Sequence, residues 1–363
     1  MRTQTQLTST LESLTPLRPL VQRAGINRRE ALAVLGATFL TTNRLTAATA
    51  PHSFVPYILG ANTAISGYGL FDAIRLVERL GFKTIEVQNL DGVPAPTPDK
   101  FPGFRFEDTS EDLKAQIKES LSGFQYITAH LPYSGLEYTA PDGPAALAAV
   151  RQLESALEAA AFLGAKVAVL HPKPAPGLEQ RDIWPIMIKR FRHWGDIAQQ
   201  NGFQLALETG YPLSVADFVD LVQEVDHDFV GATLDVGHQG RYRELAARVR
   251  PDERGTPAGI RAYNDTNIDL IERLGGKLVH LHIHDIQPAT WREHQPLIHG
   301  FVDYPRLIAK LHEIRYGGVL VFEIGGPAEE MPNYLADAKH KLEQYLRDGS
   351  NENAHGAPAP AAP

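Results

Sequence analysis

Apolar runs and helical patterns alternate along this chain from residue 55 to residue 346. Each apolar run is short, as expected for a buried strand. Each is followed by a stretch whose apolar residues recur at every third or fourth position, as Phe71, Ile74 and Val77 do, which is typical of one helix face. The alternation predicts repeated strand–helix units. The expected strands span residues 55–62, 83–89, 124–130, 166–171, 203–208, 230–235, 278–285 and 319–324.

Eight strands with intervening helices predict an α/β protein, a (β/α)8 TIM barrel in a single domain at residues 51–347. In this fold the strands pack outward on helices, and their C-terminal ends form the rim that carries the catalytic groups. Residues 348–363 are rich in Ala, Pro and Gly, so we expect a disordered tail there.

The expected strand at residues 278–285 is apolar on one face and carries imidazoles on the other. Successive side chains of a strand point to opposite faces, so His280, His282 and His284 share one face, beside Asp285. The apolar face suits packing on helices, and the imidazole face suits the barrel interior near the rim. A solvated edge strand would show the same alternation, so the polar residues of the other strands are needed to distinguish the two interpretations.

The same parity places an ionisable side chain at or near the C-terminal end of six expected strands, pointing toward the barrel axis. Taken singly, each histidine could be a hydrogen-bonded core residue and each carboxylate half of a buried ion pair. Their arrival at one rim from separate strands favours an active site. The residues are His130, His171, Glu208, Asp235, the three histidines of 278–285, and Glu323.

Several carboxylates in one cavity raise each other's pKa unless a cation compensates their charge, which favours a bound divalent metal ion. The chain has no cysteine, so thiolate ligands and disulfides are excluded and a metal must be held by His, Asp or Glu. Such oxygen and nitrogen ligands suit Mn²⁺, Co²⁺, Mg²⁺ or Zn²⁺, and the sequence does not choose among these ions.

The first fifty residues differ from the rest of the chain. They hold six arginines, no lysine and two acids, with paired arginines at Arg28 and Arg29, an uncharged run at 31–43 and an Ala-Thr-Ala end at 48–50. This order resembles a twin-arginine export signal, so residues 1–50 are expected to be cleaved and the mature protein to be periplasmic. An ordinary N-terminal helix or a lipid-facing anchor is the alternative, and without export the protein would be cytoplasmic.

The charge of the mature chain argues against a nucleic-acid partner. Subtracting the leader's +4 from the −8 of the whole chain leaves −12, whereas a duplex binder needs a basic surface to neutralise phosphates. No other segment approaches transmembrane length, so no membrane association is expected once the signal is removed. We expect a small-molecule partner, and a homo-oligomer is compatible with the sequence.

Four motifs in this order resemble the xylose-isomerase-like TIM barrel superfamily. That superfamily includes the sugar phosphate isomerase/epimerase family and the related apurinic endonuclease family 2. The resemblance covers roughly residues 55–346. The motifs are LALE at 205–208, LDVGH at 234–238, HLHIHD at 280–285 and VFE at 321–323.

The epimerase branch implies one divalent ion held by Glu208, Asp235, His282 and Glu323. It also implies that His238 contacts the substrate, and that Glu208 and Glu323 are catalytic residues that remove and return the proton of a sugar carbon. This chemistry is sound on general grounds, because a cation beside the developing oxyanion lowers the barrier to proton abstraction next to a carbonyl.

The endonuclease branch implies further zinc ions bound by His130, His171, His238 and His294. This chain departs from that branch at Arg292, where an aspartate is expected, so a third metal site is disfavoured. In a sugar enzyme the same histidines, together with Arg292, are expected to bind substrate instead. Glu86 and Trp291 could also line the pocket, although barrel packing explains both equally well.

The favoured function is a metal-dependent sugar isomerase or epimerase acting through an enediolate. Three alternatives remain. A lyase or dehydratase on oxidised sugars or glycosides would use the same metal site. A multi-zinc, endonuclease-like phosphodiesterase would bind more ions, and a non-catalytic sugar-binding barrel would need none. In a periplasmic protein, free or oxidised sugars and glycosides are expected rather than sugar phosphates.

Overall fold

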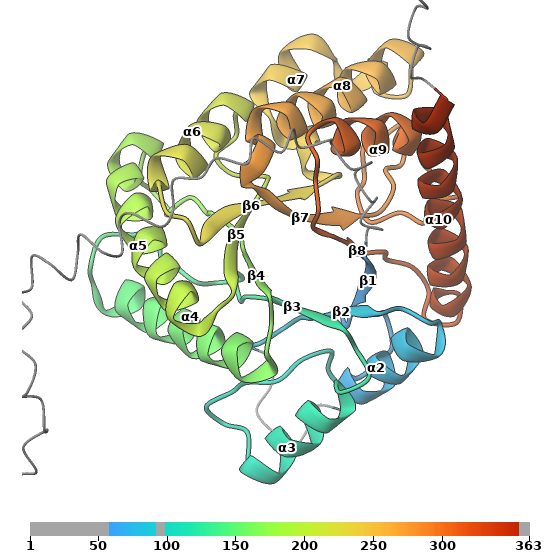
Figure 1. The fold of residues 1–363 in the computed structure, drawn as a ribbon. Helices are drawn as coiled ribbons and strands as arrows, with labels where there is room; N and C mark the ends of the chain where they lie inside the picture. Colours follow the sequence, from blue (N-terminus) through green and yellow to red (C-terminus); the bar gives the residue numbers. More distant parts are fainter. Residues whose placement is uncertain (1–57, 92–98, 356–363) are drawn as a thin grey trace, which may run out of the picture. The chain divides into compact units, whose positions relative to one another are not determined.

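The computed structural model describes residues 58–91 and 99–355 of the 363-residue chain (Figure 1). The predicted export signal at residues 1–50 lies outside the described residues, so it stays a prediction. Among the residues described, no helix combines the length and the apolar character needed to cross a bilayer.

Eight parallel strands close into a barrel in chain order, with the first strand paired to the last (Figure 1). The predicted TIM barrel is thus confirmed, and each expected strand contains or overlaps an observed one. The strands are β1 Ile58–Asn62, β2 Thr84–Val87, β3 Tyr126–His130, β4 Val167–Leu170, β5 Gln204–Glu208, β6 Val230–Asp235, β7 Leu278–Ile283 and β8 Val319–Phe322.

Helices surround the barrel on its outside (Figure 1). The last of them continues to residue 355, into the stretch predicted to be a disordered tail, and residues 356–363 lie outside the described part. The α-helices are α2 Leu70–Arg79, α3 Glu111–Ser120, α4 Pro144–Leu163, α5 Gln180–Asn201, α6 Val215–Val225, α7 Arg243–Arg248, α8 Pro257–Leu274, α9 Tyr304–Glu313 and α10 Met331–His355; the short 3-10 helices are η1 His238–Arg241, η2 Pro251–Glu253 and η3 Gly275–Lys277.

The helix boundaries follow from local sequence chemistry. Ser110 and Ser214 precede α3 and α6, and the hydroxyl oxygen of each accepts a hydrogen bond from a backbone N–H of the first turn. Gly164 and Gly202 end α4 and α5 with φ of 75° and 74°, in the left-handed region where a side chain would be strained. These caps set where each chain segment turns back toward the barrel.

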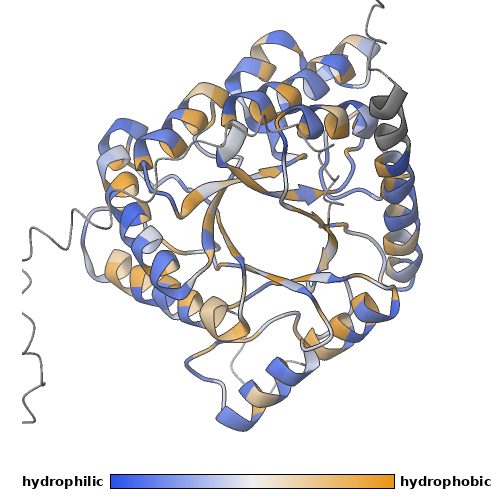
Figure 2. Cartoon of the chain, viewed as in Figure 1, coloured by the Kyte–Doolittle hydropathy of each residue, from blue (hydrophilic) through white to orange (hydrophobic). Residues whose placement is uncertain are grey.

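The apolar core lies mainly between the strands and the helices, and the strands are mostly hydrophobic (Figure 2). A second, smaller cluster fills the barrel interior with Val167, Val169 and Ala206. These residues occupy inward positions of β4 and β5. Polar inward residues lie beside this cluster as well as toward the rim, since Thr128 pairs with Val167 and His130 with Val169.

The loop after β7, residues 286–303, is tied to the barrel by one buried carboxylate. The Oδ1 atom of Asp285 accepts hydrogen bonds from the backbone N–H groups of Ile286, Phe301 and Val302 at 2.7–3.0 Å. Gly300 makes this approach possible, because a Cβ atom there would lie 1.7 Å from the same oxygen. Burial raises the pKa of Asp285 to about 6, against the three backbone hydrogen bonds, which lower it.

We expect Asp285→Ala to lower the free energy of unfolding by about 2–4 kcal/mol, because three buried N–H groups lose their acceptor. Asp285→Asn keeps an oxygen at this place and should lose clearly less. Urea denaturation of the three proteins, followed by circular dichroism, measures the difference. Equal midpoints for Asp285→Ala and the wild type would show that this carboxylate does not hold the loop.

Candidate metal centre

The structure brings together the four side chains that the resemblance implied as metal ligands. Glu208 and Asp235 end β5 and β6, His282 lies in β7, and Glu323 follows β8. One ligand atom from each residue lies within 4.8 Å of the others. The Nδ1 atom of His282 is central, at 2.9 Å from Glu208 Oε1, 3.3 Å from Glu323 Oε2 and 3.8 Å from Asp235 Oδ2.

Burial and charge act against each other at this cluster. The side chain of Glu323 is 17% exposed, whereas those of Glu208, Asp235 and His282 are at most 1% exposed. Burial raises the pKa of each carboxyl group, but the neighbouring imidazoles lower it by more. The pKa values of Glu208 and Asp235 are therefore well below normal, and the pKa of Glu323 is below normal. Burial lowers the pKa of His282, and the surrounding carboxylates raise it well above normal. All three acids are therefore ionised.

The donor set fits a divalent cation. Three ionised carboxylates in one dry place repel each other unless positive charge lies among them. Oxygen and imidazole nitrogen donors without sulfur suit Mn²⁺, Co²⁺, Mg²⁺ or Zn²⁺. The shared 4.8 Å neighbourhood of the four ligand atoms is small enough for one ion to contact them all.

Groups in a second layer hold two of these carboxylates in place. The Nε2 atom of His284 lies 3.0 Å from Asp235 Oδ1, which also accepts the backbone N–H of Gly237 at 2.6 Å. The Oε2 atom of Glu208 lies 2.9 Å from His171 Nε2 and 3.3 Å from His130 Nε2. Such partners fix the orientation of metal-binding side chains.

Three of the predicted histidines present the same ring nitrogen to the site. His130, His238 and His294 each donate Nδ1–H to a backbone carbonyl, of Leu131, Thr209 and Glu323, at 3.0, 2.6 and 2.9 Å. These hydrogen bonds assign a proton to Nδ1 of each ring and turn Nε2 toward the site, where Nε2 of His130 lies 3.3 Å from Glu208 Oε2.

Two further groups of possible ligands flank the central four. His130, His171 and Glu208 form one, and His238, Glu293 and His294 form the other. Glu293 was missed by the sequence analysis, which looked for an acid at the position of Arg292. The neighbouring Glu293 supplies the acid instead. Its position directly before His294, next to Arg292, was the feature of the sequence that could have identified it.

A pocket of about 420 Å³ opens above the cluster. Arg292 does not line it: its guanidinium donates to Gln295 Oε1 at 3.0 Å on the exposed side of the loop. Lys173 and Arg241 supply the positive charge instead, and Arg241 pairs with Glu293. The lining residues include the predicted His130, His171, Glu208, His238, His294 and Glu323, and the unpredicted Tyr133, Lys173, Tyr211, Leu213, Arg241 and Glu293.

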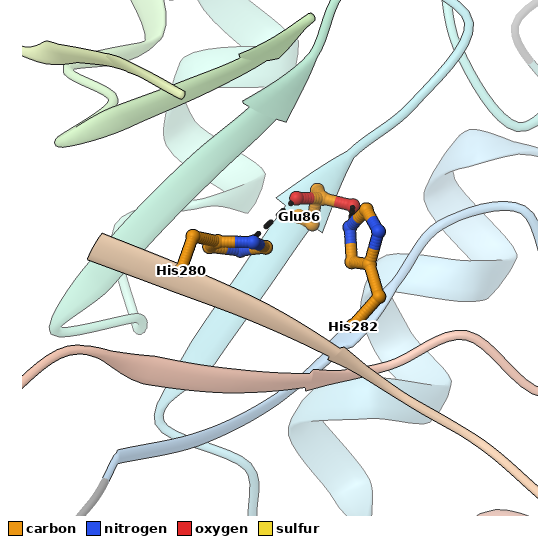
Figure 3. A group of neighbouring side chains, drawn as sticks. All are labelled: Glu86, His280 and His282. Carbon is orange, nitrogen blue, oxygen red and sulfur yellow. Dashed lines mark hydrogen bonds and ion pairs between the residues drawn. The ribbon is translucent and has the colours of Figure 1, made fainter. Parts of the chain in front are cut away.

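The remaining two sequence candidates lie away from the pocket. Trp291 packs against the ring of Tyr263 and under the guanidinium of Arg254, so the packing interpretation is the better one. Glu86 is fully buried and contacts Nε2 of His282 (Figure 3), whereas the other ring nitrogen of His282 faces the central cluster.

A family model described as xylose isomerase-like TIM barrel matches residues 74–347. The chain belongs to this family. The family's fold agrees with the closed barrel, and the match spans β5 to β8, with which the four central residues are associated.

Solved structures of xylose isomerase-like fold include sugar epimerases. A D-tagatose 3-epimerase-like protein is 18% identical, with a TM-score of 0.60 over 81% of this chain and 98% of that chain. The 3-keto-D-glucoside 4-epimerase YcjR from E. coli is 19% identical, with a TM-score of 0.58 over 79% and 99%. A D-psicose 3-epimerase is 16% identical, with a TM-score of 0.57 over 81% and 98%. At these identities the likeness establishes the fold.

A relative from Methanocaldococcus jannaschii, named uncharacterized protein MJ1311, is 24% identical over 206 residues. The match covers 54% of this chain and 64% of the relative, so the chain spans less than two thirds of that protein's length.

We expect Mn²⁺ to stabilise the protein against heat and a chelator to reverse the effect, because the ion would bind only the folded arrangement. At a hundredfold excess over Kd the gain is about 2.7 kcal/mol. Asp235→Asn should weaken Mn²⁺ binding by more than about tenfold. Differential scanning calorimetry with and without Mn²⁺ provides the measurement.

Asp269→Asn is a suitable control, because Asp269 is an exposed carboxylate on α8. A melting temperature of the wild-type protein that does not respond to any of the four candidate ions would contradict the metal centre.

Proposed function

We propose that this protein is a divalent-metal-dependent sugar isomerase or epimerase that moves a proton next to a carbonyl. The observation that carries the proposal is the placement of Glu208 and Glu323. They come from different strands, yet both line one pocket and both lie within 3.3 Å of the same nitrogen of His282. Two carboxylates that face one small space can act on a single carbon of a bound sugar.

Proton transfer by the two glutamates is the central step. A general base must be unprotonated, and the imidazoles around Glu208 and Glu323 keep their pKa values low despite burial, which raises them. One glutamate removes the proton from the sugar carbon, an enediolate forms, and the same or the other glutamate returns a proton. Return from the opposite face inverts the carbon, whereas return to the neighbouring carbon gives an isomer.

The four central residues would hold the ion, which when bound supplies stabilisation of the negative charge that develops on the substrate oxygen. His238 presents Nε2 at the pocket wall and would bind a substrate hydroxyl or carbonyl oxygen. His130 and His171 keep Glu208 in place from its other oxygen. The near-complete burial of Glu208 and Asp235 excludes water from the charged groups.

A small sugar suits the pocket. Its volume of about 420 Å³ lies in the range of small-molecule sites, and its lining mixes imidazoles and carboxylates with Tyr133, Tyr211 and Leu213. The printed names of the structural neighbours, all sugar epimerases or epimerase-like proteins among those described above, support this substrate class. With the proposed export to the periplasm, free or oxidised sugars and glycosides are the expected substrates.

We expect Glu323→Gln to lower turnover by about 10²–10⁴-fold while the fold remains intact, because the amide cannot accept the proton. Ketohexoses and 3-keto-glycosides incubated in D₂O report the step by NMR, through loss of the proton signal at the reacting carbon. Glu272→Gln, an exposed change on α8, is the matched control. Full activity of Glu323→Gln would remove this residue from the proton transfer, and a β-elimination product would identify a lyase instead.

A second candidate function is a multi-metal phosphodiesterase. The observation that favours it is the pair of flanking groups, His130–His171–Glu208 and His238–Glu293–His294. Together with the central four residues they offer ligands for as many as three neighbouring ions, because Glu293 provides the acid that Arg292 cannot. Such an arrangement would act on a phosphate ester through metal-activated water.

Counting the metal ions per chain separates the candidates. For the isomerase or epimerase we expect one ion per chain by mass spectrometry on protein purified without chelators, and no hydrolysis of bis(p-nitrophenyl) phosphate. Three ions, with hydrolysis that is lost in Glu293→Gln, would establish the phosphodiesterase. A protein that holds no ion but binds sugars would be a non-catalytic binding barrel.

A further inference from the structure

Two inward side chains of β2 and its end take no part in the proposed proton transfer, yet each contacts one of the four central residues. Glu86 is fully buried and Gln88 is 8% exposed. They lie two positions apart, so they share the face of the strand that points into the barrel. Their contacts indicate what they do.

Glu86 binds the ring nitrogen of His282 that faces away from the cluster. Its Oε1 atom lies 3.0 Å from His282 Nε2 (Figure 3), while Nδ1 of the same ring faces Glu208 and Glu323. An Nε2–H that donates to a carboxylate leaves the lone pair of Nδ1 for a metal ion. The hydrogen bond therefore determines both the tautomer of His282 and the direction of its ring.

The other oxygen of Glu86 is held as well. Its Oε2 atom lies 3.3 Å from His280 Nε2 (Figure 3) and accepts a hydrogen bond from Thr128 Oγ1 at 3.1 Å. A metal ion between Glu86, His280 and His282 would need the Nε2 nitrogen that already donates to Glu86. Both oxygens of Glu86 and the Nε2 nitrogen of His282 are thus engaged without a second ion, whereas neither ring nitrogen of His280 has a hydrogen-bond partner among the described residues.

Gln88 acts in the same way on the second glutamate. Its Nε2 atom donates to Glu323 Oε1, which leaves Oε2 as the oxygen beside His282 Nδ1. The backbone N–H of Gln88 donates to Thr63 Oγ1 at 3.0 Å, and Thr63 donates to the carbonyl of Pro102 at 2.5 Å. A neutral amide can orient a carboxylate without competing for the metal ion.

We propose that Glu86 and Gln88 are positioning residues of the metal centre. Glu86 holds the Nε2–H of His282, so that Nδ1 is the nitrogen that binds the ion. Gln88 holds Oε1 of Glu323, so that Oε2 is the oxygen that faces the ion. This inference rests on the proposed function in two ways: it assumes that an ion binds the four central residues and, for Gln88, that Glu323 transfers the proton. Residues of β2 and its end would then orient two of the four central residues, His282 and Glu323.

The test compares Glu86→Gln and Gln88→Met with Thr84→Val. Thr84 is buried on the same face of β2, and its hydroxyl has no hydrogen-bond partner among the described residues, so its replacement controls for altered barrel packing. Calorimetric titration with Mn²⁺ gives the affinity. The ¹⁵N spectrum of histidine-labelled protein, metal-free and with Zn²⁺, gives the protonation of the two ring nitrogens of His282.

We expect Glu86→Gln to weaken Mn²⁺ binding about 10–100-fold and to shift the Nε2–H signal of His282, with partial recovery in Glu86→Asp. Gln88→Met should lower the turnover number about tenfold, because Glu323 Oε1 loses its hydrogen bond and the proton-transferring carboxylate is less well oriented. KM and the Mn²⁺ affinity should change much less. Thr84→Val should leave all these quantities unchanged.

Unchanged Mn²⁺ affinity and an unchanged His282 spectrum in Glu86→Gln would overturn the inference for Glu86, and unchanged turnover in Gln88→Met would overturn it for Gln88. A second Mn²⁺ equivalent that disappears in Glu86→Gln would also overturn it, by making Glu86 a ligand. If Glu86→Gln does not fold, Glu86→Asp and Gln88→Met carry the test. A metal-binding wild type without sugar turnover would reject the proposed function alone.

Discussion

The arrangement of this barrel depends on the compensation of buried negative charge. The carboxylates of Glu86, Glu208, Asp235 and Glu323 lie in the interior or at its rim, where burial alone would keep them protonated. Imidazoles prevent this. Although burial raises the pKa of Glu86, the neighbouring histidines lower it to about 2, and the pKa values of the other three are lowered in the same way. A cation at the centre would replace protons that these imidazoles otherwise carry.

The fold tolerates this concentration of charge because the residues that stabilise the barrel are not the residues that line the charged site. The large apolar core lies outside the strands, under the helices, and a small apolar cluster that includes Val169 and Ala206 lines part of the interior. The rim is then free to hold polar residues that contribute little hydrophobic stabilisation. Loops fix the remaining pieces: Asp285 ties down the segment that carries Glu293 and His294, so flanking residues are held against the charged centre.

Strand periodicity predicted the fold and the central residues for one physical reason. Alternation in a strand fixes which side chains point inward, and the parallel barrel brings all strand ends to one rim, so Glu208 and Asp235 had to approach each other. Periodicity carries no such information for loops. Trp291 and His294 have φ of 59°, and these left-handed residues turn the chain so that Glu293, not Arg292, faces the pocket. Lys173 and Arg241 were missed for the same reason.

The alternation of side chains along a strand predicts that a side chain points inward, but it does not predict at which depth of the barrel that side chain lies. In β7 and just after it, three alternate histidines share one face, and the family resemblance implied only His282 among them as a metal ligand. The structure separates them along the barrel axis by their partners. His280 lies against Glu86, His282 contacts Glu208 and Glu323, and His284 orients Asp235. Because each step of two residues moves the strand to another layer of the barrel, the same residue type provides a buried neighbour of Glu86, a member of the central cluster and an outer support. The pairing register that sets these layers, such as His282 opposite Val321 and Glu86 opposite Thr128, joins strands that are separated by a helix in the sequence, so the alternation within one strand does not reveal it.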